Sequence, residues 1–319
     1  MQLTPRELGG TGLLVTPICI GTSPLASMPG LYGYEVSAEQ AEATIEAVLD
    51  GPLNFLDTSN NYGAGSAETC IGRVLRRRGG LPPGLVLATK VDADPGTGDF
   101  SGARVRRSVE ESLERLSLDQ VQLMYLHDPE VHLTFEQAMA DDGPVAALVD
   151  LRDQGVLRHL GVAMGEVGMM RRLVGTGVFE VALNHNRYTL LDRSAEPLMA
   201  DAAGRGIAFI NAAPYGGGIL AKGSQAQPKY AYRAAPAPVR DAVHAMSEAC
   251  ARHAVPLQAA ALQFSMRDSR VAATVVGVSK PARVTETVDL ASHELPEALW
   301  AELDTLTPPR ELWLEPPAR

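Results

Sequence analysis

Hydrophobic residues in this chain gather in short β-branched runs, and each run is followed by a turn and then by a stretch with helical spacing of apolar positions. Such runs predict strands, because β-branched side chains pack well on a pleated surface. We expect strands at 18–21, 54–58, 85–90, 121–127, 159–164, 180–184, 207–212 and 273–278.

The stretches between the runs have the pattern of amphipathic helices. The first begins at Ser37-Ala38-Glu39-Gln40, a capping box in which Ser37 and Gln40 would satisfy free backbone N–H groups, and it stops at Gly51. The helices predicted after it lie at 66–78, 101–116, 143–154, 166–174, 193–203, 238–253 and 281–290.

Strands that alternate with helices favour a closed (β/α)₈ TIM barrel, with residues 1–319 as a single domain. The competing open dinucleotide-binding sheet would carry GxGxxG after its first strand, and the chain has none there. Gly9-Gly10-Thr11-Gly12 instead predicts an N-terminal β-hairpin that closes the bottom of the barrel. Two long Pro/Gly-rich loops, 24–34 and 222–238, follow strands one and seven, where barrel loops surround the active site.

Composition narrows the possible partners. The chain has 319 residues, 45% of them hydrophobic, a formal net charge of −10 and a pI near 5.2. A globular acidic protein is predicted, which argues against nucleic acid and membrane partners because both favour basic surfaces. A small anionic ligand held by a local basic cluster stays compatible with this charge.

The cysteines and the N-terminal residues indicate in which cellular compartment the protein is expected. Cys19, Cys70 and Cys250 lie far apart and lack metal-ligand spacing, so we expect neither a disulfide nor a metal site, and a reducing cytoplasm fits best. The N-terminal MQLTPREL has no apolar signal core, and no stretch approaches the roughly 20 apolar residues that cross a bilayer.

Four residues that carry chemistry lie at predicted strand ends. Asp57 ends strand two and Tyr62 follows in the turn, while Lys90 and His127 end strands three and four. Parallel strands of a barrel end at one face, so the four side chains are expected at one rim. Asp57 would hold the ammonium of Lys90, and the ammonium would lower the pKa of Tyr62 enough for proton transfer. His127 would orient a substrate oxygen.

Such a group suits a carbonyl or alcohol whose carbon exchanges a hydride. No side chain supplies hydride, so a nicotinamide cofactor is implied. The charged residues Glu110, Glu111, Glu114 and Arg115, by contrast, are expected to form an ordinary solvated helix face.

These residues resemble the aldo-keto reductase family over nearly the whole chain, and the family's catalytic tetrad maps onto Asp57, Tyr62, Lys90 and His127. Within the family, the chain looks like the branch of L-fucose (D-threo-aldose 1-) dehydrogenases, with pyridoxal 4-dehydrogenase nearby. The motifs that carry the family resemblance are Arg6-Glu7-Leu8-Gly9, Thr11-Gly12-Leu13, Ile20-Gly21-Thr22, Asp57-Thr58, Tyr62-Gly63, Glu68, Thr89-Lys90, Ser112-Leu113, Arg115-Leu116, Leu126-His127 and Gly277-Val278-Ser279-Lys280.

The resemblance implies a cofactor across the barrel mouth. Ser279-Lys280-Pro281 runs from strand eight into a helix start, whose amides favour phosphate. Lys280 and Arg283 would face a ribose 2′-phosphate, so NADP(H) should bind at least as well as NAD(H). Glu286 resembles the adenine contact, beside Thr287 where the family usually has asparagine. The cofactor-binding residues implied in full are Thr22, Asp57, Asn184, His185, Tyr215, Gly216, Gly218, Leu220, Gly277, Ser279, Lys280, Arg283, Glu286 and Thr287.

Three positions depart from the family pattern around the nicotinamide. Many members hold the carboxamide with a Ser-Asn pair after strand five, and here this position is Ala163-Met164. A glutamine from strand six appears as His185 or Asn184. The stacking tyrosine after strand seven aligns with Ala212, with Tyr215 as a substitute.

The resulting hypothesis is an NAD(P)-dependent oxidoreductase that oxidises C1 of an aldose to a lactone, or acts on a related carbonyl or alcohol, with Tyr62 as general acid and base. The substrate contacts expected are Tyr34, Tyr62, His127 and Asp128, although Asp128 equally suits a cap of the next turn. Two alternatives stay open, namely an NADPH-dependent reductase of other aldehydes or ketones, and a non-catalytic nucleotide-binding regulator. No oligomeric state follows from the sequence.

Overall fold

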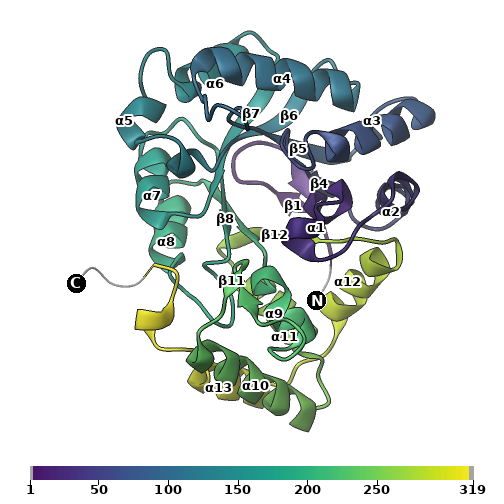
Figure 1. The fold of residues 1–319 in the computed structure, drawn as a ribbon, viewed down its shortest axis with the longest axis vertical. Helices are drawn as coiled ribbons and strands as arrows, with labels where there is room; N and C mark the ends of the chain where they lie inside the picture. The colour runs from purple at the N-terminus through teal and green to yellow at the C-terminus, as the bar shows by residue number, and fades with distance from the viewer. Residues whose placement is uncertain (1–2, 316–319) are drawn as a thin grey trace.

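The eight predicted strands close into one parallel barrel, so the predicted fold class is confirmed (Figure 1). The computed structural model describes residues 3–315. The barrel closes where the last strand pairs with the first. In order round the barrel the strands are β12 (Val271–Gly277), β3 (Ile18–Gly21), β4 (Phe55–Asp57), β5 (Val86–Val91), β6 (Val121–His127), β7 (Leu157–Met164), β8 (Val181–His185) and β9 (Ala208–Ala212).

Helices surround the strands on all sides (Figure 1). The longer ones are α2 (Ala38–Leu49), α3 (Ser66–Arg78), α4 (Gly102–Leu116), α6 (Pro144–Asp153), α7 (Val167–Gly175), α8 (Glu196–Gly204), α10 (Ala237–Arg252), α11 (Leu257–Met266), α12 (Ala282–Ser292) and α13 (Glu297–Thr305). Short turns of helix are α1 (Pro29–Tyr32), α5 (Phe135–Ala138) and α9 (Ile219–Lys222), with 3₁₀ turns η1 (Ser23–Ala26), η2 (Pro129–Val131), η3 (Gly216–Gly218) and η4 (Arg310–Leu312).

Side chains fill the inside of the barrel. Phe55, Leu123, Tyr125 and Ile210 are buried there in one hydrophobic cluster. Tyr125 fits because its neighbour on β7 is Gly161, where an added Cβ would lie 2.4 Å from the Tyr125 ring. A filled interior leaves only the ends of the barrel open to ligands.

The predicted N-terminal hairpin is present and closes the bottom of the barrel. Strands β1 (Arg6–Glu7) and β2 (Leu14–Val15) pair antiparallel. Arg6 donates hydrogen bonds to the carbonyl oxygens of Val271 and Ala272, where β12 begins. The opposite end, at the carboxyl ends of the strands, is therefore the barrel mouth.

The two long connections follow β3 and β9, as predicted, but they contain regular structure. The first holds η1 and α1. The second holds α9 and a small hairpin of β10 (Lys229–Tyr230) and β11 (Arg233–Ala234). Two-residue strands leave too short a period-two pattern for sequence analysis to detect.

Two local expectations were wrong. Ser37 accepts the N–H of Gln40, but the Gln40 side chain donates to the carbonyl oxygen of Ser279 at 2.6 Å, so the capping box is only half formed. Helix α11 was not predicted. It is buried on nearly every side from Ala259 to Met266, and a helix without a polar face has no amphipathic period.

Candidate active site

Three neighbouring strands bring the predicted catalytic residues to the mouth. Asp57 is the last residue of β4, Lys90 lies near the end of β5, and His127 ends β6. Tyr62 lies in the turn between β4 and α3, which begins at Ser66. Because these strands are parallel and adjacent, residues distant in sequence meet at one rim.

Lys90 connects the other members of the group. Its ammonium donates to Oδ1 of Asp57 at 2.6 Å, to the carbonyl oxygen of Thr58 at 2.5 Å and to the hydroxyl of Tyr62 at 3.2 Å. Only 2% of the Lys90 side chain is exposed. All three donors of the ammonium are thus used, and its position relative to the tyrosine hydroxyl is fixed by Asp57 and the backbone.

The expected lowering of the pKa of Tyr62 is not found. Burial raises the pKa of this hydroxyl well above its usual value, and the carboxylates of Asp57, Asp92 and Asp128 act in the same direction. The contact with Lys90 does not overcome these effects, because the ammonium is itself balanced by Asp57. In this structure Tyr62 is a protonated acid poised to donate.

His127 is held from both sides by carboxylates. Its Nδ1 lies 2.6 Å from Oδ1 of Asp92, and its Nε2 lies 3.6 Å from Oδ2 of Asp128. Its ring meets that of Tyr62 edge to face, with the centroids 5.9 Å apart. Burial opposes a charged imidazole, but Asp92 and Asp128 together raise the pKa of His127 above its usual value.

Asp128 does not cap the next turn through its side chain, which was one of the two readings of this residue. Its carboxylate accepts from Nε2 of His185 at 3.1 Å, and Asn186 donates to Nδ1 of the same ring at 3.2 Å. Burial opposes ionisation, yet the charge of His127 and the bond from His185 hold the pKa of Asp128 well below its usual range. A charged carboxylate therefore lies beside the reacting group.

Sequence analysis missed Asp92 and Ser59. The Ser59 hydroxyl donates to Oδ2 of Asp92 at 2.5 Å and lies 3.2 Å from Nδ1 of His127. One signal was available for Asp92, which follows Lys90 by two positions and so falls on the same side of an extended strand. Ser59 carried no such signal.

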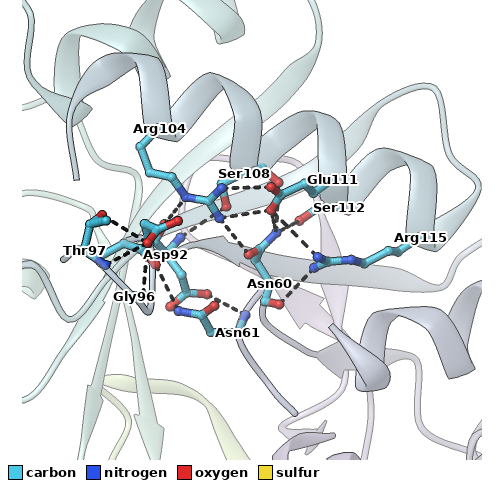
Figure 2. A network of polar contacts seen from close by, with 12 residues as sticks. Asn60, Asn61, Asp92, Gly96, Thr97, Arg104, Ser108, Glu111, Ser112 and Arg115 are labelled. Carbon is cyan, nitrogen blue, oxygen red and sulfur yellow. Dashed lines mark hydrogen bonds and ion pairs between the residues drawn. The ribbon is translucent and has the colours of Figure 1, made fainter. Parts of the chain in front are cut away.

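A partly buried polar network lies next to this rim, and two α4 residues expected on a solvated face, Glu111 and Arg115, belong to it (Figure 2). Glu111 accepts two hydrogen bonds from Arg104 at 2.8 and 3.0 Å. Arg115 donates to the carbonyl oxygen of Asn60 at 3.0 Å and to buried Glu68 at 3.2 Å. Glu110 and Glu114 are exposed as expected. The network anchors the segment that leads to Tyr62.

The residues predicted to bind a cofactor fall on three parts of the mouth. Asn184 and His185 end β8, and the buried Oδ1 of Asn184 has no hydrogen-bond partner. Gly216 and Gly218 lie in η3, and they and Gly217 all have positive φ, a backbone that only glycine adopts without strain. Gly277 is the last residue of β12, and Ser279 lies next to Lys280 in the connection between β12 and α12.

Other predicted cofactor residues are already engaged within the chain. Thr22 is buried and donates to the carbonyl oxygen of Asp57 at 3.0 Å. Thr287 is buried and donates to the carbonyl oxygen of Arg283. The guanidinium of Arg283 forms an ion pair with Glu286 at 2.6 Å. Leu220 is fully buried in the core cluster, and Tyr215 packs against that cluster.

Tyrosines from the two long connections meet above the site. Tyr34 stacks on Tyr32 with ring centroids 5.8 Å apart, and Tyr32 meets Tyr232 edge to face at 6.4 Å. Tyr34, predicted to touch substrate, forms a hydrogen bond with Ser279, and this bond and the charge of Arg283 moderate the rise that burial causes in its pKa. Tyr32, which sequence analysis did not single out, lies close enough to raise the pKa of Tyr62.

No helix within residues 3–315 is long and apolar enough to cross a membrane. In the same residues no group of three or more histidine, cysteine or acidic side chains converges as it would around a metal ion.

Comparisons with known proteins show the family of this chain. The model of the aldo/keto reductase family matches residues 17–308. The chain is 30% identical to pyridoxal 4-dehydrogenase of Microbacterium luteolum, covering 93% of this chain and 96% of that protein. It is 31% identical to D-threo-aldose 1-dehydrogenase of a Pseudomonas species, covering 95% and 97%, and 31% identical to L-galactose dehydrogenase of Arabidopsis thaliana, covering 95% and 92%.

A solved structure confirms the fold. The holo form of an aldo-keto reductase from Bacillus halodurans superimposes with a TM-score of 0.76 at 22% identity, covering 96% of this chain and 97% of that one. The family model spans most of this chain and includes every residue of the Asp57, Tyr62, Lys90 and His127 group. The chain therefore belongs to the aldo/keto reductase family of oxidoreductases.

Proposed function

We propose that this protein is an NAD(P)-dependent dehydrogenase that oxidises the C1 hydroxyl of an aldose to a lactone and, in reverse, reduces a carbonyl. The observation that carries the proposal is the buried contact of Lys90 with both Asp57 and the Tyr62 hydroxyl, beside His127. The aldose is supported by two relatives named for aldose oxidation, each 31% identical over 95% of this chain.

Tyr62 is the proton carrier. In reduction its hydroxyl proton goes to the carbonyl oxygen of the substrate, and in oxidation the phenolate accepts the proton of the C1 hydroxyl. Lys90 stabilises the phenolate through its direct contact at 3.2 Å, and Asp57 keeps the ammonium in place at 2.6 Å. When bound, the nicotinamide supplies or accepts the hydride, which no side chain does.

His127 orients the substrate oxygen. Because Asp92 holds Nδ1, the Nε2 atom is the one available to an oxygen placed next to the Tyr62 hydroxyl. Asp128 lies beside that position and is held ionised. A carboxylate accepts two hydrogen bonds readily, so Asp128 suits the further hydroxyl groups of a sugar.

The cofactor fits the residues present at the mouth. The partnerless Oδ1 of Asn184 is an acceptor for an amide N–H such as that of a carboxamide. Three successive glycines with positive φ, at 216–218, leave backbone groups accessible to a pyrophosphate. Lys280 and Arg283 supply positive charge where α12 begins. Arg283 pairs with Glu286, so we assign the 2′-phosphate of NADP(H) to Lys280 first.

We place the enzyme in the cytoplasm, with a small aldose or carbonyl compound as its partner. The three cysteines are free and buried, which suits a reducing compartment. Burial raises the pKa of the Cys19 and Cys70 thiols, so neither has the character of a reactive thiolate.

The test is a panel of aldoses and simple aldehydes assayed in both directions with NADP(H) and NAD(H). Tyr62→Phe is expected to lower kcat by about 10²- to 10⁴-fold while cofactor binding, followed by fluorescence, is retained. Tyr125→Phe is the matched control, because it removes a buried tyrosine hydroxyl that has no hydrogen-bond partner.

Each result of these assays tests one part of the proposed function. Near-normal turnover by Tyr62→Phe would refute the proton-transfer role. Turnover of simple aldehydes without any aldose would refute the substrate class. Tight cofactor binding without turnover of any compound would refute the enzymatic proposal in favour of a nucleotide-binding regulator.

A further inference from the structure

Asp92 is the carboxylate that lies nearest to His127, and the family motifs named above do not include it. It follows β5 directly and is only 6% exposed. Its Oδ1 lies 2.6 Å from Nδ1 of His127, a distance typical of a charge-assisted hydrogen bond. Burial of an ionised carboxylate is costly unless the group is paired and fully hydrogen-bonded.

Asp92 meets these conditions. Its second oxygen accepts the hydroxyl of Ser59 at 2.5 Å and the backbone N–H of Asn61 at 3.0 Å. Its own backbone N–H donates to the Ser108 hydroxyl at 3.3 Å, and Arg104 donates to its carbonyl oxygen at 3.2 Å (Figure 2). The carboxylate is thus fixed to the turn that carries Tyr62, and the backbone of Asp92 is fixed to helix α4.

This geometry decides which ring nitrogen of His127 meets the substrate. An ionised carboxylate only accepts hydrogen bonds, so Nδ1 must carry a proton and donate it to Asp92. The Nε2 atom then lies 3.6 Å from the second carboxylate, that of Asp128. Each ring nitrogen of His127 therefore has a carboxylate beside it, and a proton on either nitrogen faces a negative charge.

The charges that act on the ring come from several elements. Asp92 after β5 and Asp128 after β6 favour the imidazolium, and Lys90 on β5 opposes it. Burial also opposes it, and the net effect raises the pKa of His127 while lowering that of Asp92. The other titratable groups around this rim are Asp57 on β4, Tyr62 after β4 and His185 on β8, which is bonded to Asp128.

We propose that Asp92 is a positioning residue that keeps both ring nitrogens of His127 protonated at neutral pH, so that Nε2 always donates a hydrogen bond to the substrate oxygen. Its catalytic consequence rests on the proposed function, since that is where a substrate oxygen enters. A permanently charged donor beside Tyr62 favours negative charge building on that oxygen.

The main test is nuclear magnetic resonance of the histidine ring nitrogens in the ligand-free protein, with His127→Asn used to assign the signal. In the wild type both ring nitrogens of His127 should stay protonated above the usual histidine range. Asp92→Asn keeps the shape but removes the charge, and should lower the midpoint of the titration by about 1–3 pH units.

Asp94→Asn is the matched control. Asp94 lies two residues further on, is partly exposed, and its side chain bonds within its own loop to Gly96 and Thr97. This variant should titrate at His127 as the wild type does. Ser59→Ala serves as a second variant if Asp92→Asn does not fold, and it should shift the midpoint in the same direction by a smaller amount.

Activity gives the second readout. In Asp92→Asn the alkaline limb of kcat/KM for carbonyl reduction should move to lower pH together with the His127 midpoint, and kcat/KM at neutral pH should fall about 10-fold or more, with cofactor affinity unchanged. A purely structural role would lower activity at all pH values alike. An unchanged His127 midpoint in Asp92→Asn would overturn the proposal. The resonance experiment decides this even if no substrate is turned over, so failure of the proposed function is seen separately.

Discussion

The ammonium of Lys90 lies 2.6 Å from Oδ1 of Asp57, while Oδ2 of the same carboxylate is buried without a hydrogen-bond partner. The pair is therefore held by one strong contact in a site that is almost fully buried. Burial raises the pKa of Asp57, and the charge and hydrogen bond of Lys90, with a smaller effect from His127, oppose that rise. Removal of Lys90 should therefore affect the stability of the protein differently from removal of both residues.

Lys90→Met should destabilise the protein by about 3–5 kcal/mol, because it leaves a buried carboxylate without its partner. The double variant Lys90→Met with Asp57→Asn should recover much of this loss, since no uncompensated charge is left. Urea unfolding of the two variants measures the difference. Both variants should lack activity, because neither supports the Tyr62 phenolate.

If the single and double variants are equally destabilised, the loss comes from packing of the lysine stem rather than from charge.

The raised pKa of Tyr62 predicts opposite behaviour of the two reaction directions with pH. Oxidation needs the phenolate, and a raised pKa keeps the phenolate a minor form through the neutral range. The kcat/KM for aldose oxidation should therefore rise with pH, approaching tenfold per unit up to about pH 10. Reduction needs the protonated hydroxyl and should show no such rise. An oxidation rate that is flat from neutral to alkaline pH would contradict this.

Two helical glycines provide a test of packing. At Gly72 in α3 an added Cβ would lie 1.8 Å from the carbonyl oxygen of Arg115 on α4, so Gly72→Ala must force the two helices apart. We expect it to destabilise the protein by about 1–3 kcal/mol or more. Gly175→Ala, at the end of α7 with nothing within 4 Å, should be neutral or stabilising by up to about 1 kcal/mol. Thermal unfolding of both variants compares the two sites.

Asp268 predicts a loss of stability in acid. Hydrogen bonds from Arg270 and from the Tyr188 hydroxyl lower the pKa of its carboxyl from 3.8 to about 2, against burial. Because the folded state has the lower pKa, this stabilisation is present above about pH 4 and is lost as the pH falls towards 2. The group is partly exposed, so we expect about 1 kcal/mol from it at neutral pH.

Asp268→Asn should accordingly lose that amount at pH 7 and little at pH 2, as measured by urea unfolding at each pH. An equal loss at both values would mean that the shape of the side chain, and not its charge, is what matters.

Much of the fold followed from local patterns, because each strand of the barrel and most of the longer helices can be recognised from a short stretch of sequence. The prediction failed where that local signal is missing. Helix α11 is apolar all round, and β10 and β11 have two residues each. The Gln40 side chain left its predicted capping partner for Ser279, which is 239 positions away in sequence.

The sequence by itself determined the barrel, the family, and the placement of Asp57, Tyr62, Lys90 and His127 at strand ends, since parallel strands must end at one face. Only the tertiary structure decided how these groups are charged. Asp92 became the partner of His127 through packing of β5 against β6, and Arg115 on α4 became the partner of Glu68 on α3. The pKa of Tyr62 is raised, whereas the sequence predicted that it would be lowered. The reason is the same, because burial and the sum of nearby charges depend on distances in space, which spacing along the chain does not contain.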